Sequence, residues 1–501
     1  MKKRQIPLRP WYHFTPPQNW MNDPNGLCYY RSHYHLFYQH NPNDINWGDM
    51  SWGHAVSTDL LHWQDRPLAL PATDKEMAFS GSVIVDTEGT TPFARQNRQP
   101  FIACYTACNR QDNRQYQNLA ISPDHGEHWQ FFEGNPVLDI NETDFRDPKI
   151  FQVMEHPDWF MVVALPDNQR VHFYRSRDLI HWTFLSEFGV DRDTGGKWEC
   201  PEMIYFPPKK NFNKALWVLK VDVMKTGVCY FVGTFDAEKF TPLHRHPRFL
   251  PDGPDFYAAQ TFFGYTTRFK NPLWLGWLNN WEYADDIPAD NWRGVMSVPR
   301  ELFLAGNPEE PLLYQLPPES LKRQFRNVIS LRNAGWEQLH REVGNLTFSQ
   351  WALLLSLDVS LKCEPRFKEN AFLQFRLRDH RDIICQFKLG LNRVEIERLS
   401  HPLKNSVDSF TFSNEETQHG KTSPEPEHNS SARHRLEIWL DFNSLEVFYN
   451  SGAQVVSALI FPGSRHLKLE VESRQAQIHF WEFDIYEIPQ TIVRKERVEQ
   501  E

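Results

Sequence analysis

The chain has 501 residues, a formal net charge of -10, and 40% hydrophobic against 24% charged residues. This is the composition of a globular protein of two to four domains, and the lack of a basic stripe excludes nucleic acid and anionic membranes as main partners. No stretch approaches the roughly 20 apolar residues that a membrane-spanning helix needs.

Cysteine usage and the N-terminal residues predict a cytoplasmic protein. The 7 cysteines are an odd number without the spacing of a disulfide framework, which is typical of a reducing compartment. Cys104 and Cys108 have no second pair to complete a zinc site, so we expect no metal. Met1 to Pro7 is basic, but no apolar segment of a secretory signal follows it.

Short segments rich in β-branched and aromatic residues follow one another through the first 300 or so residues. Residues 34–39, 81–86, 159–164 and 215–220 are of this kind, and Pro, Gly, Asn and Asp bound them. Segments with a helical period are scarce. The sequence therefore predicts an all-β protein.

A weak internal repeat runs through the same region. Residues 57–63 (STDLLHW) resemble residues 176–182 (SRDLIHW), and residues 122–129 (SPDHGEHW) are a looser copy. Repeats of this size in an all-β region indicate propeller blades, and about 300 residues would hold about five of them. Chance similarity is the alternative, since only three copies are readable.

The pattern changes between residues 306 and 345, where several prolines precede a charged stretch that could be helical. We interpret this segment as a linker between a propeller domain of residues 1–305 and a second domain of residues 346–492. In the second domain, Leu467, Leu469 and Val471 alternate with charged residues, as in the strands of a β-sandwich. Residues 413–431 are polar and predict a mobile surface loop.

Asp23 is the most informative residue of the chain. Its setting, Trp20-Met21-Asn22-Asp23-Pro24-Asn25-Gly26, predicts a tight turn and not a regular element. The neighbouring amides would favour the ionised carboxylate, and Trp20 would offer a flat apolar face. A fixed, ionised carboxylate of this kind suits a nucleophile that faces a sugar ring.

Two more carboxylates have similar settings, Asp147 in Arg146-Asp147-Pro148 and Glu199 in Trp198-Glu199-Cys200-Pro201. The less polar neighbours of Glu199 predict a raised pKa and a proton donor, whereas Arg146 would keep Asp147 charged, to hold sugar hydroxyls. Each motif alone is more often a turn or a strand end. Three acids in this order among repeated blades predict one shared cavity, and glycoside hydrolysis.

Further motifs accompany these acids along nearly the whole chain. They are residues 34–39 (YHLFYQ), 47–48 (WG), 52–55 (WGHA), 79–82 (FSGS), 146–148 (RDP), 199–201 (ECP) and 440–448 (LDFNSLEVF). Together with the seven residues around Asp23, they resemble glycoside hydrolase family 32, the invertase, levanase and inulinase group. The resemblance implies a five-bladed β-propeller followed by a C-terminal β-sandwich.

By matching position, the resemblance also implies roles. Asp23 would be the nucleophile, Glu199 the acid/base and Asp147 the transition-state stabiliser in retaining cleavage of a terminal β-D-fructofuranosyl unit, without metal or cofactor. Tyr257 would support Glu199. The substrate-binding residues would be Asn22, Gln39, Trp47, Phe79, Ser80, Arg146 and Trp281, with a plain core role as the alternative for Trp281.

The substrate within the family is less closely defined. Residues 276–284, followed by residues 292–294, resemble the levanase and exo-inulinase branch, and the missing signal segment favours sucrose or fructo-oligosaccharides over polymer. Glu202 and Leu278 depart from the common pattern but remove no catalytic group. A fructosyltransferase, a sucrose-6-phosphate hydrolase, an arabinanase-type hydrolase and a non-catalytic binding propeller remain alternatives, and a homodimer is possible.

Overall fold

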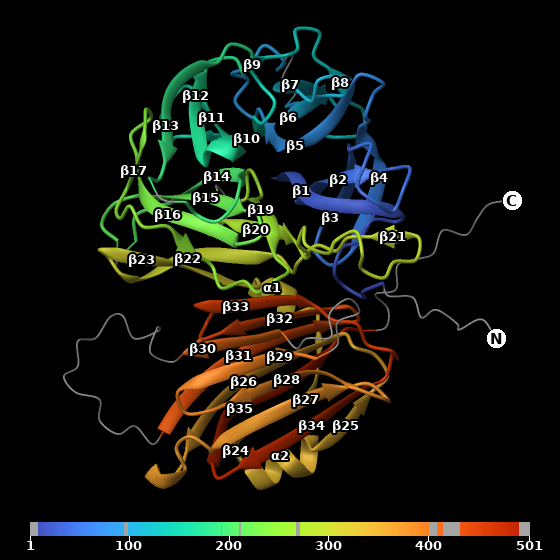
Figure 1. Ribbon diagram of the computed structural model, residues 1–501, viewed down its shortest axis with the longest axis vertical. Helices are drawn as coiled ribbons and strands as arrows, with labels where there is room; N and C mark the ends of the chain where they lie inside the picture. Colours follow the sequence, from blue (N-terminus) through green and yellow to red (C-terminus); the bar gives the residue numbers. More distant parts are fainter. Residues whose placement is uncertain are drawn as a thin grey trace, which may run out of the picture.

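The computed structural model describes residues 9–94, 99–191, 193–209, 212–266, 271–399, 408–413 and 431–489. They form two β-domains, one above the other in Figure 1, and the short helix α1 (Glu319–Lys322) lies between them. The N-terminal basic segment and almost all of the loop expected at 413–431 lie outside the described residues. The expected all-β fold, a propeller followed by a sandwich, is confirmed.

The first domain is a propeller of five antiparallel blades. Blade 1 has β1 (Asn19–Tyr30), β2 (His33–Asn41), β3 (Ser51–Ser57) and β4 (Trp63–Leu70). Blade 2 has β5 (Glu76–Val85), β6 (Phe101–Asn109), β7 (Gln115–Ser122) and β8 (Gln130–Phe131), and β9 (Leu138–Glu142) also pairs with β7. Blade 3 has β10 (Arg146–Gln152), β11 (Trp159–Leu165), β12 (Arg170–Ser176) and β13 (Thr183–Gly189), with the 3-10 helix η1 (Pro166–Asn168) between β11 and β12.

The last two blades complete the ring. Blade 4 has β14 (Trp198–Phe206), β15 (Leu216–Val223), β16 (Gly227–Phe235), β17 (Phe240–Pro242) and β18 (Arg248–Phe249), and blade 5 has β19 (Tyr257–Thr261), β20 (Leu273–Trp277), β22 (Arg300–Asn307) and β23 (Glu310–Leu316). The first strand of each blade contacts the first strand of the next, from β1 through β5, β10 and β14 to β19 and back to β1. Strand β21 (Trp292–Arg293) pairs in parallel with β1 and ties the end of the propeller to its beginning.

The sequence repeat marks one turn that recurs in the blades. After the third strand of blade 1, the Ser57 hydroxyl accepts a hydrogen bond from the Leu60 amide at 2.8 Å, and Asp59 accepts one from the His62 amide at 2.8 Å. The turn after the third strand of blade 3 has the same bonds at matching positions, and the turn of blade 2 has a similar set. The repeat therefore reflects blade architecture and not chance.

The second domain is a sandwich of two six-stranded sheets. One sheet has, in spatial order, β24 (Arg326–Gly335), β35 (Gln477–Glu487), β26 (Leu353–Lys362), β31 (Ser431–Asp441), β32 (Ser444–Tyr449) and β33 (Gln454–Leu459). The other has β25 (Asn345–Phe348), β34 (Leu467–Arg474), β27 (Phe372–Arg378), β28 (Ile383–Leu389), β29 (Arg393–Arg398) and β30 (Asp408–Ser413). Helix α2 (Trp336–Val343) and the 3-10 helix η2 (Pro365–Phe367) complete the domain.

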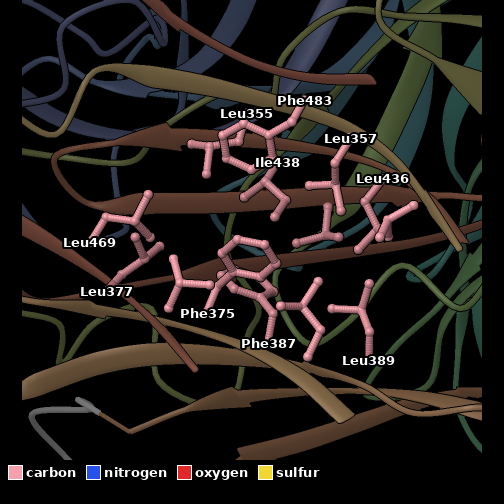
Figure 2. Close-up of a cluster of buried hydrophobic side chains, with 14 of the residues drawn as sticks. Leu355, Leu357, Phe375, Leu377, Phe387, Leu389, Leu436, Ile438, Leu469 and Phe483 are labelled. Carbon is pink, nitrogen blue, oxygen red and sulfur yellow. The ribbon is translucent and has the colours of Figure 1, made fainter. Parts of the chain in front are cut away.

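The sandwich core is built from the inward side chains of both sheets, such as Leu355, Phe375 and Ile438 (Figure 2). Leu467, Leu469 and Val471 on β34 are buried, while Lys468 and Glu470 between them are partly exposed, which confirms the alternation read from the sequence. The inward apolar side chains therefore form a core that belongs to the sandwich itself.

The boundary between the domains differs from the expected one. Strand β23 extends blade 5 to Leu316, past residue 305, because it pairs with β22 along its whole length. Strand β24 already belongs to the sandwich, where it pairs with β35. Most of the segment interpreted as a linker, residues 306–345, is therefore part of one domain or the other, and the connection between them is short.

Buried charges hold the two domains together. Arg300 on β22 donates to Glu446 of the sandwich at 2.5 Å, and both side chains are fully buried. His13 bridges Glu446 and Asp441, with its ring nitrogens 3.0 Å from each carboxylate. We call Arg300, His13, Glu446 and Asp441 the interdomain network. Each carboxylate of this network has a hydrogen-bonded partner in Arg300 or His13, which is the condition under which buried ions can be tolerated.

Two general properties complete the description. All seven cysteines are buried and free. Among the described residues, no helix has the length and apolar character needed to cross a membrane, and no group of three or more His, Cys, Asp or Glu side chains could hold a metal ion.

Candidate active site

A cleft of about 510 Å³ opens where the first strands of the five blades converge. Its wall includes the three predicted acids, which the chain carries on three different blades. It also includes every residue predicted to bind substrate, namely Asn22, Gln39, Trp47, Phe79, Ser80, Arg146 and Trp281. The fold therefore brings all ten predicted site residues into one cavity.

The first strand of every blade loses its regular pairing at the cleft. The register with the second strand shifts between Met21 and Pro24 in blade 1, and corresponding shifts occur at residues 78–81, 146–149, 199–202 and 257–260. Asp23 thus lies within a bulged strand, β1, and not in the tight turn expected from the sequence. A bulge redirects side chains, and here each one turns polar groups toward the propeller axis.

The bulges hold residues in an unusual backbone conformation. Asp147, Cys200 and Ala258 have positive φ angles of 65°, 48° and 54°, although none is a glycine. Such conformations are uncommon outside glycine and gather at functional sites, where the surrounding structure enforces them. The prolines after Asp23, Asp147 and Cys200 are the sequence signal for these bulges, since proline is excluded from regular central pairing.

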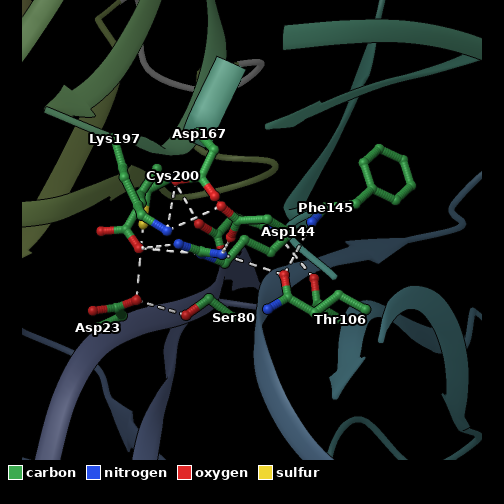
Figure 3. Close-up of polar contacts among 12 residues, drawn as sticks. Asp23, Ser80, Thr106, Asp144, Phe145, Asp167, Lys197 and Cys200 are labelled. Carbon is green, nitrogen blue, oxygen red and sulfur yellow. Dashed lines mark hydrogen bonds and ion pairs between the residues drawn. The ribbon is translucent and has the colours of Figure 1, made fainter. Parts of the chain in front are cut away.

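Asp23 is held by two donors. Its carboxylate accepts a hydrogen bond from the Ser80 hydroxyl at 2.7 Å (Figure 3) and another from the Asn22 amide at 3.0 Å. Burial raises the pKa of Asp23, and these two hydrogen bonds only partly oppose it. The expected donors are present and lower the pKa, as the sequence indicated, but desolvation outweighs them and the net shift is upward.

Glu199 has polar partners on both carboxylate oxygens. Arg146 donates to one oxygen at 2.8 and 3.1 Å, and the Tyr257 hydroxyl donates to the other at 2.5 Å. The less polar setting expected from Trp198 and Cys200 is therefore not observed, because neighbours in sequence do not surround the side chain. The support expected from Tyr257 is present.

Asp147 is buried and lines the cleft with the other two acids. Its carboxylate accepts a hydrogen bond from the Cys200 amide at 2.9 Å. Burial raises the pKa of Asp147 to about 7, although the nearby charge of Arg146 lowers it. Arg146 gives its hydrogen bonds to Glu199, Asp144 and Gln115, so its charge favours the ionised form of Asp147, as expected, but does not cancel the effect of burial.

Cys200 joins the three acids. It follows Glu199 in the chain, its amide binds Asp147, and its sulfur lies 3.8 Å from the Asp23 carboxylate (Figure 3). This places the acids of blades 1, 3 and 4 around one residue at the base of the cleft.

A buried ion pair supports the base of the cleft from behind. Lys220 and Asp222 on β15 are fully buried and bonded to each other, and Asp222 pairs in register with Glu199. The Lys220 ammonium also donates to the backbone carbonyls of Cys200 at 3.1 Å and Ala259 at 2.7 Å. Lys220 therefore holds together the bulged strands of blades 4 and 5.

Aromatic rings form one side of the cleft. Trp47 is 43% exposed and meets Phe79 edge-on with ring centres 6.1 Å apart. Trp281 lines the cleft and stacks on Trp20, with 6.1 Å between the ring centres. Trp20 itself is fully buried, so it supports Trp281. The prediction that Trp20 offers its own flat face to a sugar is therefore wrong.

Six wall residues were not predicted: Gln115, Thr143, Asp144, Asp167, Lys197 and Met224. Lys197 bridges Asp144 at 3.1 Å and Asp167 at 2.8 Å, which links blade 3 to blade 4 at the rim (Figure 3). Thr143 and Asp144 lie shortly before the Arg146-Asp147-Pro148 motif, and Lys197 directly precedes the Trp198-Glu199-Cys200-Pro201 motif, so these three had a nearby signal. The others lie in or beside connections between strands, where no local pattern reveals which side chains will meet.

A cleft lined by three carboxyl groups and an aromatic wall has the groups that a glycoside hydrolase needs: one acid to protonate the leaving oxygen and one carboxylate to attack or to activate water. Comparison with known proteins gives the same class. The descriptions "Glycosyl hydrolases family 32 N-terminal domain" and "Glycosyl hydrolases family 32 C terminal" match residues 13–317 and 330–487. The chain belongs to glycosyl hydrolases family 32, and it is a glycosidase that hydrolyses O-glycosyl bonds.

Individual relatives are similar along most of their length. The chain is 37% identical over 477 residues to a levanase of Bacillus subtilis (strain 168), covering 92% of this chain and 68% of the relative. The crystal structure of an exo-inulinase from Aspergillus awamori matches with a TM-score of 0.81 and 29% identity, over 98% of this chain and 100% of the other. A β-fructofuranosidase from Schwanniomyces occidentalis complexed with fructosyl-erythritol matches with a TM-score of 0.79 and 27% identity, over 96% and 97%.

Proposed function

We propose that this glycosidase releases fructose from the non-reducing end of sucrose, fructo-oligosaccharides or fructans. The observation that carries the proposal is the joining of Asp23, Asp147 and Glu199 around Cys200 in one cleft. The fructoside substrates follow from the relatives, which are a levanase, an exo-inulinase and a β-fructofuranosidase.

The reaction we propose is a double displacement. Asp23 attacks the anomeric carbon C2 of the fructosyl unit while Glu199 gives its proton to the departing oxygen, which leaves a covalent fructosyl ester on Asp23. Glu199 then takes a proton from water, the hydroxide attacks C2, and the ester bond breaks to free Asp23 and fructose. The configuration at C2 is retained because it is inverted twice.

The supporting residues have separate tasks in this scheme. Ser80 and Asn22 hold the Asp23 carboxylate at 2.7 and 3.0 Å, so that one oxygen can face the sugar. Arg146 and Tyr257 hold Glu199 from two sides. Asp147 would bind fructose hydroxyls, and the backbone bond to Cys200 fixes its direction.

The charges of the cleft favour a neutral substrate over a phosphorylated one. Its wall carries five carboxyl groups, those of Asp23, Asp144, Asp147, Asp167 and Glu199. Among the described residues of the wall, the cationic side chains are those of Arg146 and Lys197, and both are already paired with carboxylates. A phosphate group would meet net negative charge here, which argues against sucrose 6-phosphate.

The experiment that tests the proposal is a product analysis with sucrose, 1-kestose, inulin, levan and sucrose 6-phosphate. We expect fructose from the unphosphorylated fructosides and little from sucrose 6-phosphate. Proton NMR in the first minutes should show β-fructofuranose as the initial product. Initial α-fructofuranose would contradict the double displacement, and growth of longer oligosaccharides would identify fructosyl transfer. A cytoplasmic location and a homodimer stay predictions, which cell fractionation and light scattering would measure.

A further inference from the structure

A second pocket, of about 210 Å³, lies in blade 2 beside the catalytic cleft. The two cavities share strand β5: Ala78 lines the second pocket, and the next two residues, Phe79 and Ser80, line the cleft. The pocket is smaller than the roughly 300–1,000 Å³ of sites for drug-sized ligands, so it suits a single ring. Nothing in the chemistry of the cleft described above uses it.

Aromatic rings form the walls of this pocket. Phe131 on β8 is 44% exposed, which is unusual for a phenyl ring, and its centre lies 6.3 Å from that of Tyr105. Phe132 also lines the pocket. Exposed aromatic side chains around a concavity provide a flat apolar surface, on which the carbon-bound hydrogens of a sugar ring can lie.

Two side chains of the pocket lining, Glu76 and Asn118, carry hydrogen-bond acceptors that bear on a ligand. The Glu76 carboxylate is partly exposed and is held in place by the Tyr116 hydroxyl and, at 3.4 Å, by the Asn118 amide. The Asn118 side-chain oxygen is buried and accepts no hydrogen bond from any residue that the structure describes. An unpaired buried acceptor is costly, and the long bond to Glu76 leaves the amide able to turn toward a ligand hydroxyl.

We propose that this pocket is a second carbohydrate-binding site, which holds one sugar ring of a fructan or oligosaccharide while the end of a chain is cleaved in the neighbouring cleft. The inference rests on the proposed function for its substrate. Glu76 and Asn118 accept hydrogen bonds from sugar hydroxyls, and Phe131 covers the apolar face of the ring. Within the described residues, Glu76 is the one formally charged group of the lining, so the pocket favours a neutral polyol over an anion.

The chain offers a matched control for Phe131. Phe131 and Phe184 each stand two residues after the tryptophan of the blade repeat, on the fourth strands of blades 2 and 3. Phe184 is also exposed, by 52%, but it contacts His172 and Tyr174 and lines neither cavity. The variants Phe131→Ala and Phe184→Ala therefore remove the same group from equivalent places, with and without the pocket.

The test compares kcat/KM on inulin and on sucrose for the full-length protein. Phe131→Ala should lower kcat/KM for inulin about fivefold, since an aromatic contact is worth about 0.5–1.5 kcal/mol, and leave kcat/KM for sucrose within about twofold. Glu76→Gln should act in the same direction. Phe184→Ala should leave the inulin-to-sucrose ratio unchanged. An unchanged ratio in Phe131→Ala, or an equal fall in Phe184→Ala, would overturn the proposal.

Affinity electrophoresis through an inulin-containing gel gives a measurement that does not depend on catalysis. In the inactive Asp23→Ala background, inulin should retard the protein, and adding Phe131→Ala should reduce this retardation while Phe184→Ala should not. Equal retardation in both double variants would refute the second site. If wild-type protein released no fructose from any fructoside, the proposed function would fail, and this gel would still decide whether the pocket binds the polymer.

Discussion

Two buried charged regions of this molecule shift the pKa values of their carboxyl groups in opposite directions. At the base of the cleft, Asp23, Asp147 and Asp222 crowd together, and burial raises the pKa of each of them. In the interdomain network, burial would raise the pKa of Glu446, but Arg300 and His13 outweigh it and the pKa is lowered.

The difference depends on how far nearby cations offset burial. In the interdomain network, Arg300 and His13 more than offset the effect of burial on Glu446, whereas at the base of the cleft Lys220 and Arg146 do not offset the effect of burial on Asp222 and Asp147. Substitutions that neutralise charge should therefore have opposite consequences in the two regions. The expected effects below run from the largest to the smallest.

Asp23→Asn should remove activity without loss of stability. We expect turnover of sucrose to fall at least ~10³-fold, because the nucleophile is gone, and Asp23→Ala and Glu199→Ala should fold normally and lose a similar factor. The melting temperature of Asp23→Asn should equal or exceed that of wild type, since a buried carboxylate with a raised pKa is replaced by a neutral amide. Near wild-type cleavage by Asp23→Asn would remove the proposed nucleophile. Azide should rescue Glu199→Ala, which keeps Asp23.

Lys220→Met should lower both the stability of the protein and its activity. The variant leaves Asp222 buried without its partner, which should cost about 3 kcal/mol of unfolding free energy by urea denaturation. The double variant Lys220→Met/Asp222→Asn should recover much of the stability, because the orphaned charge is gone. Its activity should stay low, since the carbonyls of Cys200 and Ala259 remain without their shared donor. Full recovery of activity would show that Lys220 has no positioning role.

The interdomain network should make the unfolding free energy depend on pH. Burial alone would lower the pKa of His13, but Asp441 and Glu446 raise it to about 9. Its stabilisation is complete below the unfolded pKa of about 6.5 and is lost as the pH rises through 9. Between pH 6.5 and 9 we expect the unfolding free energy to fall by about 2 kcal/mol through His13.

Two histidine variants isolate this contribution. His13→Gln should be less stable than wild type but should have a flatter profile across that pH range. In His434→Gln the alkaline fall should persist, because burial lowers the pKa of His434 to about 4 and that residue is neutral throughout. Parallel profiles for His13→Gln and wild type would contradict the assignment.

Tyr257→Phe should have the smallest effect. It removes the hydroxyl that donates to Glu199 at 2.5 Å and leaves the ring in place. We expect kcat on sucrose to fall about tenfold, as for one hydrogen bond to a charged group, with little change in melting temperature. An unchanged kcat would mean that Arg146 alone positions Glu199.

Much of this arrangement could be predicted from the sequence. Three short motifs identified the acids: the residues around Asp23, Asp147-Pro148 and Glu199-Cys200-Pro201. The repeated turn indicated the blades. Bulges and strand ends leave local marks, because proline is excluded from regular pairing. The pKa directions of Asp23 and Asp147 could not be predicted, since burial depends on the closed propeller.

Contacts between side chains of different blades or domains also could not be predicted from the sequence. Arg300 and Glu446 are 146 positions apart, and each has an ordinary local setting. Lys197 and Asp167 meet only because blades 3 and 4 are neighbours. Such pairs result from the tertiary structure and have no periodicity to reveal them.

The most direct test of the account is a crystal structure of Asp23→Asn soaked with sucrose. We predict a fructosyl unit in the cleft, with C2 next to residue 23, the glycosidic oxygen within hydrogen-bond reach of Glu199, and fructose hydroxyls on Asp147. Sucrose bound with its glycosidic bond facing away from residue 23 and Glu199, or bound outside the cleft alone, would contradict the assignment of these three acids.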